Sequence, residues 1–373
     1  MTRRLMVVLG TRPEAIKLAP VIAALRARPE AFRTVVCSTG QHREMLEQSL
    51  AAMDLQPDIR LDVMQEGQDL SGLTTRLLTT LRGAIAEARP DRVIVQGDTT
   101  TAFAAALAAY YEKIPVAHVE SGLRSNNRYS PFPEEFNRRA ISVIADLHFA
   151  PTKAAADVLI SEGVAGGSVH VTGNTVVDAL EAVKGMMGQP EWRARISANI
   201  RAIVEQPSPV IIVSCHRRES FGDDLKAICR AISRLAQDFP ASRFVFPVHP
   251  NPVVRKPVSE HLGAVSNVDL LQPLSYPDFL FLLAHAKLAL TDSGGIQEEA
   301  PSFGVPVLVL RRHTERTEAV TAGLAVLVGP DEDAIVRHAR AFLRGDASIP
   351  STANPFGDGR AANRIVQALA EIP

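Results

Sequence analysis

The amino-acid sequence repeats one pattern through both halves: a short apolar run, a turn that contains glycine or threonine, and then a helical stretch. Apolar runs of this kind indicate strands buried on both faces of a parallel sheet, with helices as the connections. In the first half the pattern predicts strands over residues 5–9, 34–37, 92–95, 116–119 and 147–149. In the second half it predicts strands over residues 210–214, 243–248, 288–290, 305–310 and 326–328. The predicted fold class is therefore α/β, with two parallel sheets in succession.

The length of the chain favours two domains, because 373 residues are too many for one small core. We predict a Rossmann-like first domain over residues 1–170 and a Rossmann-like second domain over residues 171–356. No low-complexity linker marks the boundary, which we place at a short run that ends in Thr172, Gly173 and Asn174. Residues 357–373 are expected to form a helix that packs back on the first domain.

The charge balance argues against nucleic acid and membranes as partners. The sequence has 40 basic and 41 acidic side chains and a formal net charge of -1, so no global field draws it to a polyanion. No apolar stretch approaches the ~18 residues of a membrane span. The three cysteines are widely spaced and odd in number, which is typical of a reducing compartment. We expect a cytoplasmic protein with three free thiols.

Ligands of open parallel sheets bind beyond the carboxyl ends of the strands, so the loops after the strands are the candidate sites. The first such loop carries Arg12 and Lys17 at a helix start, which suits an anion; a capped helix with solvated charges explains it equally well. The loop after residues 92–95 carries Asp98. By itself Asp98 is better explained as the N-cap of a helix that begins near Thr100.

Carboxylates follow the next strand. Glu120 comes directly after residues 116–119, and a buried glutamate there needs a partner or a chemical role. Glu134 and Glu135 stand at a proline-led helix start. Capping of that helix by its first-turn acids is the alternative interpretation, and it explains Glu135 well.

The second half repeats this arrangement with different chemistry. His216 lies at a strand end beside two arginines, although a lone histidine is usually structural. After residues 288–290 comes a turn whose free N–H groups predict a diphosphate cradle, formed by Ser293, Gly294 and Gly295. One helical turn on, Glu299 is placed to accept ribose hydroxyls, and Arg316 follows the next strand.

Several cofactor motifs are excluded. Residues 357–362 match a dinucleotide fingerprint formally, but no strand precedes them. No P-loop occurs, and none of the four tyrosines is followed four places later by lysine, which counts against nicotinamide-dependent short-chain epimerases. The acidic run over residues 331–333 begins a helix and is explained by capping. We predict no cofactor and no metal.

The ordered motifs together resemble the bacterial, non-hydrolysing UDP-N-acetylglucosamine 2-epimerases, over nearly the whole chain. The motifs that carry the resemblance are Gly10-Thr11-Arg12-Pro13-Glu14-Ala15-Ile16-Lys17, Gly97-Asp98-Thr99-Thr100, His118-Val119-Glu120, Pro133-Glu134-Glu135, His216-Arg217-Arg218-Glu219-Ser220 and Thr291-Asp292-Ser293-Gly294-Gly295-Ile296-Gln297-Glu298-Glu299. The resemblance implies a glycosyltransferase-B architecture. By resemblance the catalytic positions are Asp98, Glu120, Glu134 and His216. The substrate-binding positions are Arg12, Lys17, Phe279, Ser293, Gly294, Gly295, Glu299 and Arg316.

The family also has a second substrate site through which UDP-N-acetylglucosamine activates its own conversion. Its positions match Gln41, His42, Gln68, Arg217, Glu219 and His249. Two residues depart from the family pattern: Thr317 replaces a proline, and Leu274 replaces a polar residue near the uracil. A homodimer formed through the first domain is the expected assembly.

The resemblance implies reversible epimerisation at C2 by elimination of UDP and its re-addition to 2-acetamidoglucal, which supplies N-acetylmannosamine units for surface polysaccharide. One carboxylate cannot serve both faces of the sugar, so an acid–base cluster is required. The alternatives are a hydrolysing epimerase of the same fold, an epimerase of a diacetamido uronic acid, a retaining glycosyltransferase and a nucleotide-sugar sensor.

Overall fold

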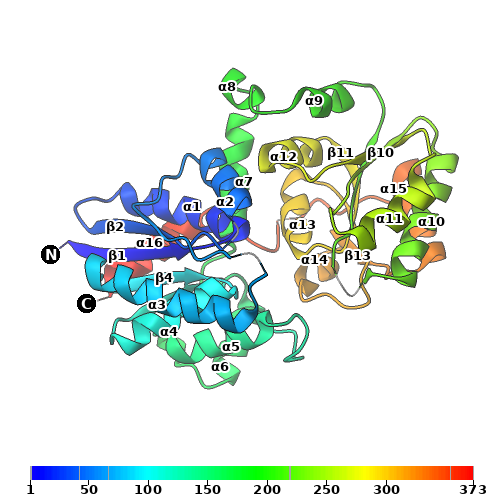
Figure 1. Ribbon diagram of the computed structural model, residues 1–373. Helices are drawn as coiled ribbons and strands as arrows, with labels where there is room; N and C mark the ends of the chain where they lie inside the picture. Colours follow the sequence, from blue (N-terminus) through cyan, green and yellow to red (C-terminus); the bar gives the residue numbers. More distant parts are fainter. Residues whose placement is uncertain (1, 42, 66, 218–219, 353, 373) are drawn as a thin grey trace. The chain divides into compact units, whose positions relative to one another are not determined.

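The computed structural model describes residues 2–41, 43–65, 67–217, 220–352 and 354–372. Packing divides the chain into two compact units (Figure 1). Met1–Ala182 and Phe356–Pro373 form unit 1, and Val183–Pro355 form unit 2.

The division falls after Ala182, whereas the sequence placed the domain boundary at residues 170/171. Two features move it. Strand β7 (Val169–Val171) pairs with β6 and completes the first sheet at its edge. Helix α7 (Thr175–Met186) then begins within unit 1, where Asp178 accepts hydrogen bonds from the backbone N–H groups that start α16 (Ala361–Glu371).

The described part of unit 1 contains a seven-stranded parallel sheet in the order β3-β2-β1-β4-β5-β6-β7. This is the doubly wound order in which the chain reverses direction across the sheet between β1 and β4. Its strands are β1 (Arg3–Leu9), β2 (Phe32–Ser38), β3 (Ile59–Arg60), β4 (Arg92–Gln96), β5 (Val116–Val119), β6 (Leu147–Ala150) and β7.

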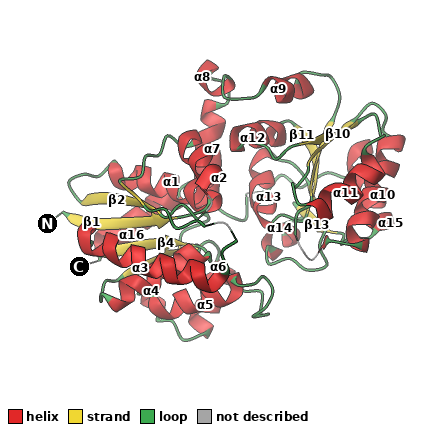
Figure 2. Ribbon diagram, viewed as in Figure 1, coloured by secondary structure: helices red, strands yellow, loops and turns green. Residues whose placement is uncertain are grey.

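Helices cover both faces of this sheet (Figure 2). One core lies between the sheet and helices α1, α2 and α16, and the other lies between the sheet and helices α3, α4 and α5. The C-terminal helix α16 packs on α1, with Ile365 and Leu369 in the same buried cluster as Leu18 and Ile22. Besides α7 and α16, the described helices of unit 1 are α1 (Arg12–Arg26), α2 (Arg43–Ala52), α3 (Leu70–Ala88), α4 (Thr100–Tyr111), α5 (Glu134–Ile144), α6 (Lys153–Ser161) and the 3-10 turn η1 (Gly166–Ser168).

Unit 2 repeats the doubly wound order, with six described parallel strands in the order β10-β9-β8-β11-β12-β13. Its strands are β8 (Val210–Ser214), β9 (Arg243–Pro247), β10 (Val268–Leu271), β11 (Ala286–Thr291), β12 (Val307–Val309) and β13 (Ala325–Leu327). Helices α10, α11 and α15 bury one face in a single apolar core, and α12 and α13 pack on the other. The helices are α8 (Pro190–Arg193), α9 (Ala198–Val204), α10 (Asp223–Asp238), α11 (Pro252–Leu262), α12 (Tyr276–Ala284), α13 (Gly294–Glu299), η3 (Ala300–Phe303), α14 (Thr317–Thr321) and α15 (Glu332–Arg344).

The predicted fold class, two parallel α/β sheets, is confirmed. Every predicted strand overlaps an observed one, and the sequence missed β3, β7 and β10. All three lie at or beside a sheet edge, where a strand is short and only partly buried, so its apolar run is weak.

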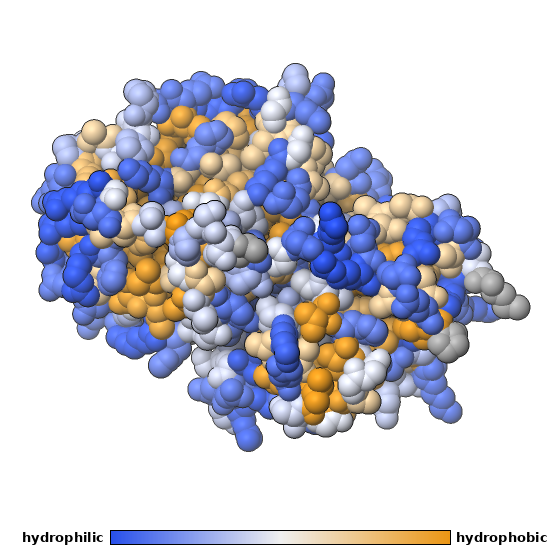
Figure 3. Space-filling view, turned by 180° about the vertical axis from the view of Figure 1, so that it is seen from behind, coloured by the Kyte–Doolittle hydropathy of each residue, from blue (hydrophilic) through white to orange (hydrophobic). Residues whose placement is uncertain are grey.

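The surface keeps some large apolar side chains among hydrophilic ones, as the face in Figure 3 illustrates. On helices α4 and α5 the exposed ones are Tyr110, Tyr111, Phe136 and Val143. Among the residues that the structure describes, no helix has the length and apolar character needed to cross a bilayer. All three cysteines are free, as predicted, and all three are buried.

Candidate functional site

The sheets reverse their winding between β1 and β4 in unit 1 and between β8 and β11 in unit 2, and several predicted site residues follow these strands. Ligands of doubly wound sheets bind in the crevice that forms at this point, beyond the carboxyl ends of the strands. We call the two groups the first half-site, in unit 1, and the second half-site, in unit 2.

The first half-site begins with the turn between β1 and α1. Thr11 and Glu14 form a capping box at the start of α1, which places Arg12 at the first helical position. The loop approaches its neighbours closely: a Cβ at Gly10 would lie 2.2 Å from Thr39 Oγ1 and 2.3 Å from Thr101 Oγ1, so only glycine fits. This turn places a cation, Arg12, at the end of the sheet.

Glu14 is fully buried and joins two loops. Its Oε2 accepts hydrogen bonds from Gly10 N (3.0 Å) and from Thr11 N and Oγ1 (both 2.8 Å). Its Oε1 accepts one from Thr99 Oγ1 (2.7 Å), at the start of α4. Burial raises the pKa of Glu14 to about 7, against the effect of these four donors. The carboxyl group therefore fastens the β1–α1 turn to the β4–α4 turn.

Glu120 directly follows β5 and has a left-handed backbone, with φ of 63°. A non-glycine residue in this region is strained and needs surrounding contacts to hold it. Lys17 Nζ contacts Oε1 at 2.5 Å and Asn174 Nδ2 donates to the same oxygen at 3.1 Å, while Gln96 Nε2 donates to Oε2. The lysine, like the glutamate, is nearly buried. Glu120 is thus a carboxylate fixed by donors from three separate elements.

Asp98 does not cap helix α4. Thr99 is the N-cap, with Oγ1 accepting from Ala102 N at 3.0 Å, so the capping explanation of Asp98 was wrong. The Asp98 carboxylate pairs instead with the Arg138 guanidinium, and its backbone carbonyl accepts from Asn137 Nδ2 at 2.9 Å. Both partners lie on α5, so this helix sets the position of Asp98.

The turn that carries Asp98 is also held from the sheet. His118 Nε2 donates to the carbonyl of Gly97 at 2.7 Å, and burial lowers the pKa of this histidine to about 3, so the ring stays neutral. Gly97 has a positive φ of 68°, and a Cβ there would lie 3.5 Å from Glu120 Oε2. The turn consequently brings Asp98 and Glu120 to neighbouring strand ends.

The two glutamates at the start of α5 differ. Glu135 is fully buried, accepts from Ser125 N at 2.9 Å and pairs with Arg139 at 2.9 Å, so it has a structural role. Glu134 is half-buried at the first position of the helix, one turn before the Arg138 that holds Asp98. The structure thus separates a structural glutamate from an accessible one.

The second half-site centres on His216 and Asp292. Asp292 is fully buried at the end of β11 and accepts from His216 N (3.0 Å) and Arg217 N (2.9 Å), from Ser220 Oγ (3.0 Å) and from Cys215 Sγ (3.3 Å). The imidazole Nδ1 of His216 lies 3.4 Å from Asp292 Oδ1, and its side chain is 46% exposed.

Burial lowers the pKa of His216, and the charges of Arg217 and His249 act in the same direction, whereas Asp292 opposes them. A histidine with a lowered pKa is largely neutral near pH 7 and can accept a proton. Asp292 therefore sets both the loop and the ring orientation of a candidate base.

The predicted phosphate cradle lies at the start of α13, where Ser293 is the N-cap residue. Arg316 crosses this turn so closely that a Cβ at Gly294 would lie 3.0 Å from its guanidinium carbon. Two carboxylates hold the guanidinium: Glu298 Oε1 at 2.9 Å and Glu315 Oε1 at 2.5 Å. A side chain at position 294 would press on the arginine, a contact that glycine avoids.

Glu315 is the centre of an arginine cluster. Besides Arg316 it pairs with Arg311 at 2.9 Å and with Arg217 at 3.7 Å. Burial acts to raise the pKa of Glu315, but the three arginines outweigh it and lower that pKa to about 2. A permanently charged glutamate thus aligns three cations beside the Ser293–Gly294 turn.

The remaining predicted binding residues lie on α12 and α13. Glu299 is nearly buried, with its Oε1 3.5 Å from the hydroxyl of Tyr276. Phe279 is half-buried one turn further along the helix that Tyr276 begins. The residues predicted to bind the nucleoside thus stand on elements that pack against the same sheet.

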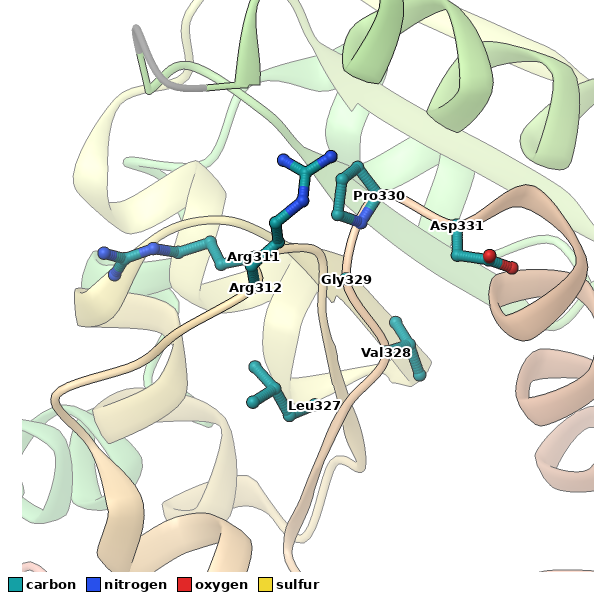
Figure 4. A pocket seen from close by; sticks show the side chains of 7 residues that line it. All are labelled: Arg311, Arg312, Leu327, Val328, Gly329, Pro330 and Asp331. Carbon is teal, nitrogen blue, oxygen red and sulfur yellow. The ribbon is translucent and has the colours of Figure 1, made fainter.

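A pocket of about 410 Å³ opens at the ends of β12 and β13 (Figure 4). It is lined by Arg311, Arg312, Leu327, Val328, Gly329, Pro330 and Asp331. The Arg311 and Arg312 side chains leave the strand end in different directions (Figure 4): Arg311 pairs with Glu315, and Arg312 pairs with Asp224 of α10 at 2.6 Å. The pocket therefore adjoins the arginine cluster.

The positions predicted for a second substrate site divide between the units. In unit 1, Gln41 Oε1 accepts from Thr101 Oγ1 at 2.7 Å and Gln68 Oε1 accepts from Gln65 N at 3.2 Å. In unit 2, Arg217 belongs to the arginine cluster, and the exposed His249 accepts from Asn251 N through Nδ1 at 3.1 Å. His42 and Glu219 lie outside the described residues.

Sequence reasoning missed the residues that hold the candidate groups in place: Gln96, Arg138, Asn174, Asp292 and Glu315. Asp292 was within reach, because an acid that directly follows a strand and precedes a glycine turn is a recognisable signal. The contacts of the others join segments that are far apart in the sequence, and no local pattern indicates them.

Comparison with known proteins follows from this geometry. A family model for UDP-N-acetylglucosamine 2-epimerase matches residues 23–370. The UDP-N-acetylglucosamine 2-epimerase of Escherichia coli is 47% identical over 370 residues, which are 98% of this chain and 98% of the relative.

Solved structures agree. The crystal structure of UDP-GlcNAc 2-epimerase from Neisseria meningitidis bound to UDP-GlcNAc has a TM-score of 0.89 at 43% identity, covering 99% of this chain and 100% of the other. The Methanocaldococcus jannaschii UDP-GlcNAc 2-epimerase, in complex with UDP-GlcNAc and UDP, has a TM-score of 0.84 at 32% identity, covering 98% and 99%. The likeness extends over nearly the full length of both.

Proposed function

We propose a reaction course for this chain on the premise that it belongs to the UDP-N-acetylglucosamine 2-epimerase family, as its family model and full-length relatives establish. It is an isomerase, an epimerase of UDP-N-acetylglucosamine. We propose further that it interconverts UDP-N-acetylglucosamine and UDP-N-acetylmannosamine without hydrolysis, by elimination and re-addition of UDP. The observation that carries the proposal is the fixed, nearly buried Glu120 carboxylate beside Lys17 and the Asp98 turn.

The chemistry of the sugar requires elimination. The C2 proton is not adjacent to a carbonyl, so its direct removal leaves a carbanion that nothing stabilises, and the barrier is very high. In the proposed forward step a base takes the C2 proton, the C1–C2 double bond forms, and the C1–oxygen bond breaks with its electron pair on UDP. In the return step the UDP oxygen bonds to C1 while an acid protonates C2 from the opposite face.

The two faces of the sugar need different acid–base groups, and we assign these to Asp98, Glu120, Glu134 and His216. Asp98 and Glu120 stand at neighbouring strand ends in the first half-site, and each is held by fixed donors. His216 is oriented by Asp292 in the second half-site. Neither the elimination nor the re-addition transfers a hydride, so the proposed course uses no nicotinamide.

The departing diphosphate needs positive charge and N–H donors. We assign this task to Arg12 and Lys17 in unit 1, and to Arg316 with the turn over residues 293–295 in unit 2. Glu299 is assigned to the ribose and Phe279 to the uracil. Support comes from Arg316, which two carboxylates hold across Gly294.

The wider setting belongs to the same proposal. We place the enzyme in the cytoplasm, where its product supplies N-acetylmannosamine units for surface polysaccharide, and we propose a homodimer. A second UDP-N-acetylglucosamine bound by Gln41, His42, Gln68, Arg217, Glu219 and His249 activates turnover. Sigmoidal dependence of the rate on UDP-N-acetylglucosamine supports this activation, and hyperbolic kinetics with no effect of added substrate on the reverse reaction removes it.

The proposal is tested by proton NMR of UDP-N-acetylglucosamine with the purified protein in heavy water. The expected result is deuterium at C2 together with UDP-N-acetylmannosamine, with UDP still bonded to the sugar. Release of free UDP with free N-acetylmannosamine identifies a hydrolysing epimerase instead. Transfer of the sugar to an added acceptor, without exchange at C2, identifies a glycosyltransferase.

A further inference from the structure

The junction at which the chain leaves unit 1 and later re-enters it lies directly against Glu120. The link is Asn174, which directly precedes helix α7 and is 3% exposed. Its side-chain Nδ2 donates to Glu120 Oε1 at 3.1 Å, and its backbone N donates to the carbonyl of Phe356 at 2.6 Å. One residue therefore contacts both the carboxylate and the returning segment.

The orientation of the Asn174 amide is determined by the helix. Its Oδ1 accepts from Val176 N at 3.1 Å, which is the bond that an N-cap residue makes to the first turn. Because the oxygen is engaged there, the amide nitrogen must face Glu120; the reversed amide would place an oxygen against a carboxylate and would lose the cap. The start of α7 thus determines that a donor faces Glu120.

The backbone beside Asn174 packs against the returning segment at Gly357. Gly173 and Gly357 both have positive φ, of 92° and 141°, and a Cβ on Gly173 would lie 3.5 Å from the Cα of Gly357. The outgoing and returning segments therefore run in direct contact. Asp178 of α7 fastens the same two segments through the N–H groups of Ala361 and Ala362, at 3.1 and 2.8 Å.

We infer that Asn174 is a positioning residue for the epimerisation, which holds the Glu120 carboxylate in its reactive orientation and ties it to the returning C-terminal segment of unit 1. This inference rests on the proposed function, because it takes Glu120 as an acid–base group. Lys17 approaches Glu120 from α1 with a positive charge, whereas Gln96 of β4 and Asn174 approach as neutral amides. Lys17 supplies positive charge to Glu120. Asn174 fixes the orientation of the Glu120 carboxylate, which the left-handed backbone of Glu120 does not fix by itself.

Two substitutions separate this role from simple helix capping, because serine and aspartate both cap helices well. Asn174→Ser keeps the cap and removes the donor, and we expect kcat to fall about 10²-fold with KM unchanged, since Asn174 acts on Glu120 and not on substrate. Asn174→Asp keeps the cap and sets a second carboxylate beside Glu120. We expect kcat to fall further and the acid limb of the pH profile of kcat/KM to move to higher pH, because neighbouring like charges favour protonation.

The matched control is Asp331→Ser, which likewise replaces an N-cap side chain by serine, at the start of α15, where Oδ1 accepts from Ala334 N at 2.7 Å. Its kcat and pH profile are expected to equal those of the native protein. Active enzyme in each variant is counted by titration with UDP, so that misfolded protein does not lower kcat.

Glu120→Gln, measured beside these variants, distinguishes the two possible failures. If Glu120→Gln retains native kcat, the assignment of Glu120 fails and the inference fails with it. If Glu120→Gln is slow while Asn174→Ser and Asn174→Asp match the native kcat and pH profile, the inference alone is overturned. A lowered melting temperature with unchanged kcat per active site likewise overturns it, because it shows that Asn174 serves only as a cap.

Discussion

Each half-site holds the loop after its central strand with one buried carboxylate, but the two carboxylates come from different places. In unit 1 Glu14 lies in the first turn of the helix that it caps, and accepts hydrogen bonds from Gly10 N and Thr11 N. In unit 2 Asp292 follows the neighbouring strand β11 and accepts hydrogen bonds from His216 N and Arg217 N. In the same sheet order, one buried carboxylate thus holds the loop in each unit, although it comes from a different sequence position in each.

The exposed chemistry differs between the half-sites. The first carries Asp98, Glu120 and Glu134 together with the cations Arg12 and Lys17, which suits the proposed proton transfer at the sugar. The second presents a histidine and an arginine cluster around Glu315, which suits a diphosphate. The comparison indicates that the fold supplies loop positions, whereas the side chains after each strand divide the work.

The largest effect is expected where the first half-site loses its acid–base group. Glu120→Gln should lower kcat about 10³-fold, because an amide cannot take a proton from the sugar, with a smaller change in KM. Steady-state kinetics measure this, with Glu112→Gln, at the C-terminal end of α4, as the control expected to be native-like. A kcat within a few-fold of native for Glu120→Gln contradicts the division of work.

The next largest effect is expected from the loss of the Asp292 carboxylate in unit 2. Asp292→Asn places an N–H group among donors that need an acceptor, so kcat/KM should fall about 10²-fold through misplacement of His216. The free energy of unfolding should drop by about 1–3 kcal/mol for the donors left unsatisfied. Asp269→Asn, which breaks the pair with Arg243 near the sheet edge, is the control. Equal kinetics for the two variants would remove the role of Asp292.

The arginine cluster is expected to act on binding. Glu315→Gln removes the charge that aligns Arg217, Arg311 and Arg316, so KM should rise about tenfold, or about 1.4 kcal/mol, with kcat little changed. Calorimetric titration with UDP should show the same loss of affinity. A fall in kcat with unchanged UDP affinity would place the cluster in the chemical step instead.

The smallest effect concerns stability and pH in unit 1. Burial raises the pKa of Glu14 from its ordinary value of 4.5 to about 7 in the folded protein, so the folded state binds more protons between these values. The free energy of unfolding therefore falls as pH rises through that window. Glu14→Gln removes this contribution, and the difference in unfolding free energy between about pH 5 and about pH 8 should shrink by on the order of 1–3 kcal/mol. Denaturant titrations at both pH values measure it; an unchanged difference contradicts the raised pKa.

Sequence pattern predicted most of the fold, because strands buried on both faces leave continuous apolar runs such as residues 5–9 and 210–214. Edge strands escaped it. β3 has two residues, and β10 has four that are only partly buried, with Asp269 among them. The first domain extends past the predicted boundary because contacts of Asp178 with α16, distant in sequence, keep the start of α7 in unit 1.

The candidate groups could be recognised in the sequence where a residue lies within two positions of a strand end, as Asp98, Glu120 and His216 do. The capping explanation of Asp98 went wrong because Thr99 also caps helices, and Asp98 pairs instead with Arg138, forty positions away. Asn174 and Glu315 act through side chains that meet only in the folded chain. Their roles therefore become visible in the structure and not in the sequence.

The central claim, that the C1–oxygen bond breaks during epimerisation, is tested most directly by positional isotope exchange. UDP-N-acetylglucosamine carrying oxygen-18 in the bridge between C1 and the β-phosphorus is incubated with the enzyme and followed by phosphorus NMR. Elimination frees the diphosphate, so the label should move to non-bridging positions at a rate comparable with turnover. Epimerised product that keeps all of its label in the bridge would contradict the account, because the bond to UDP would then never have broken.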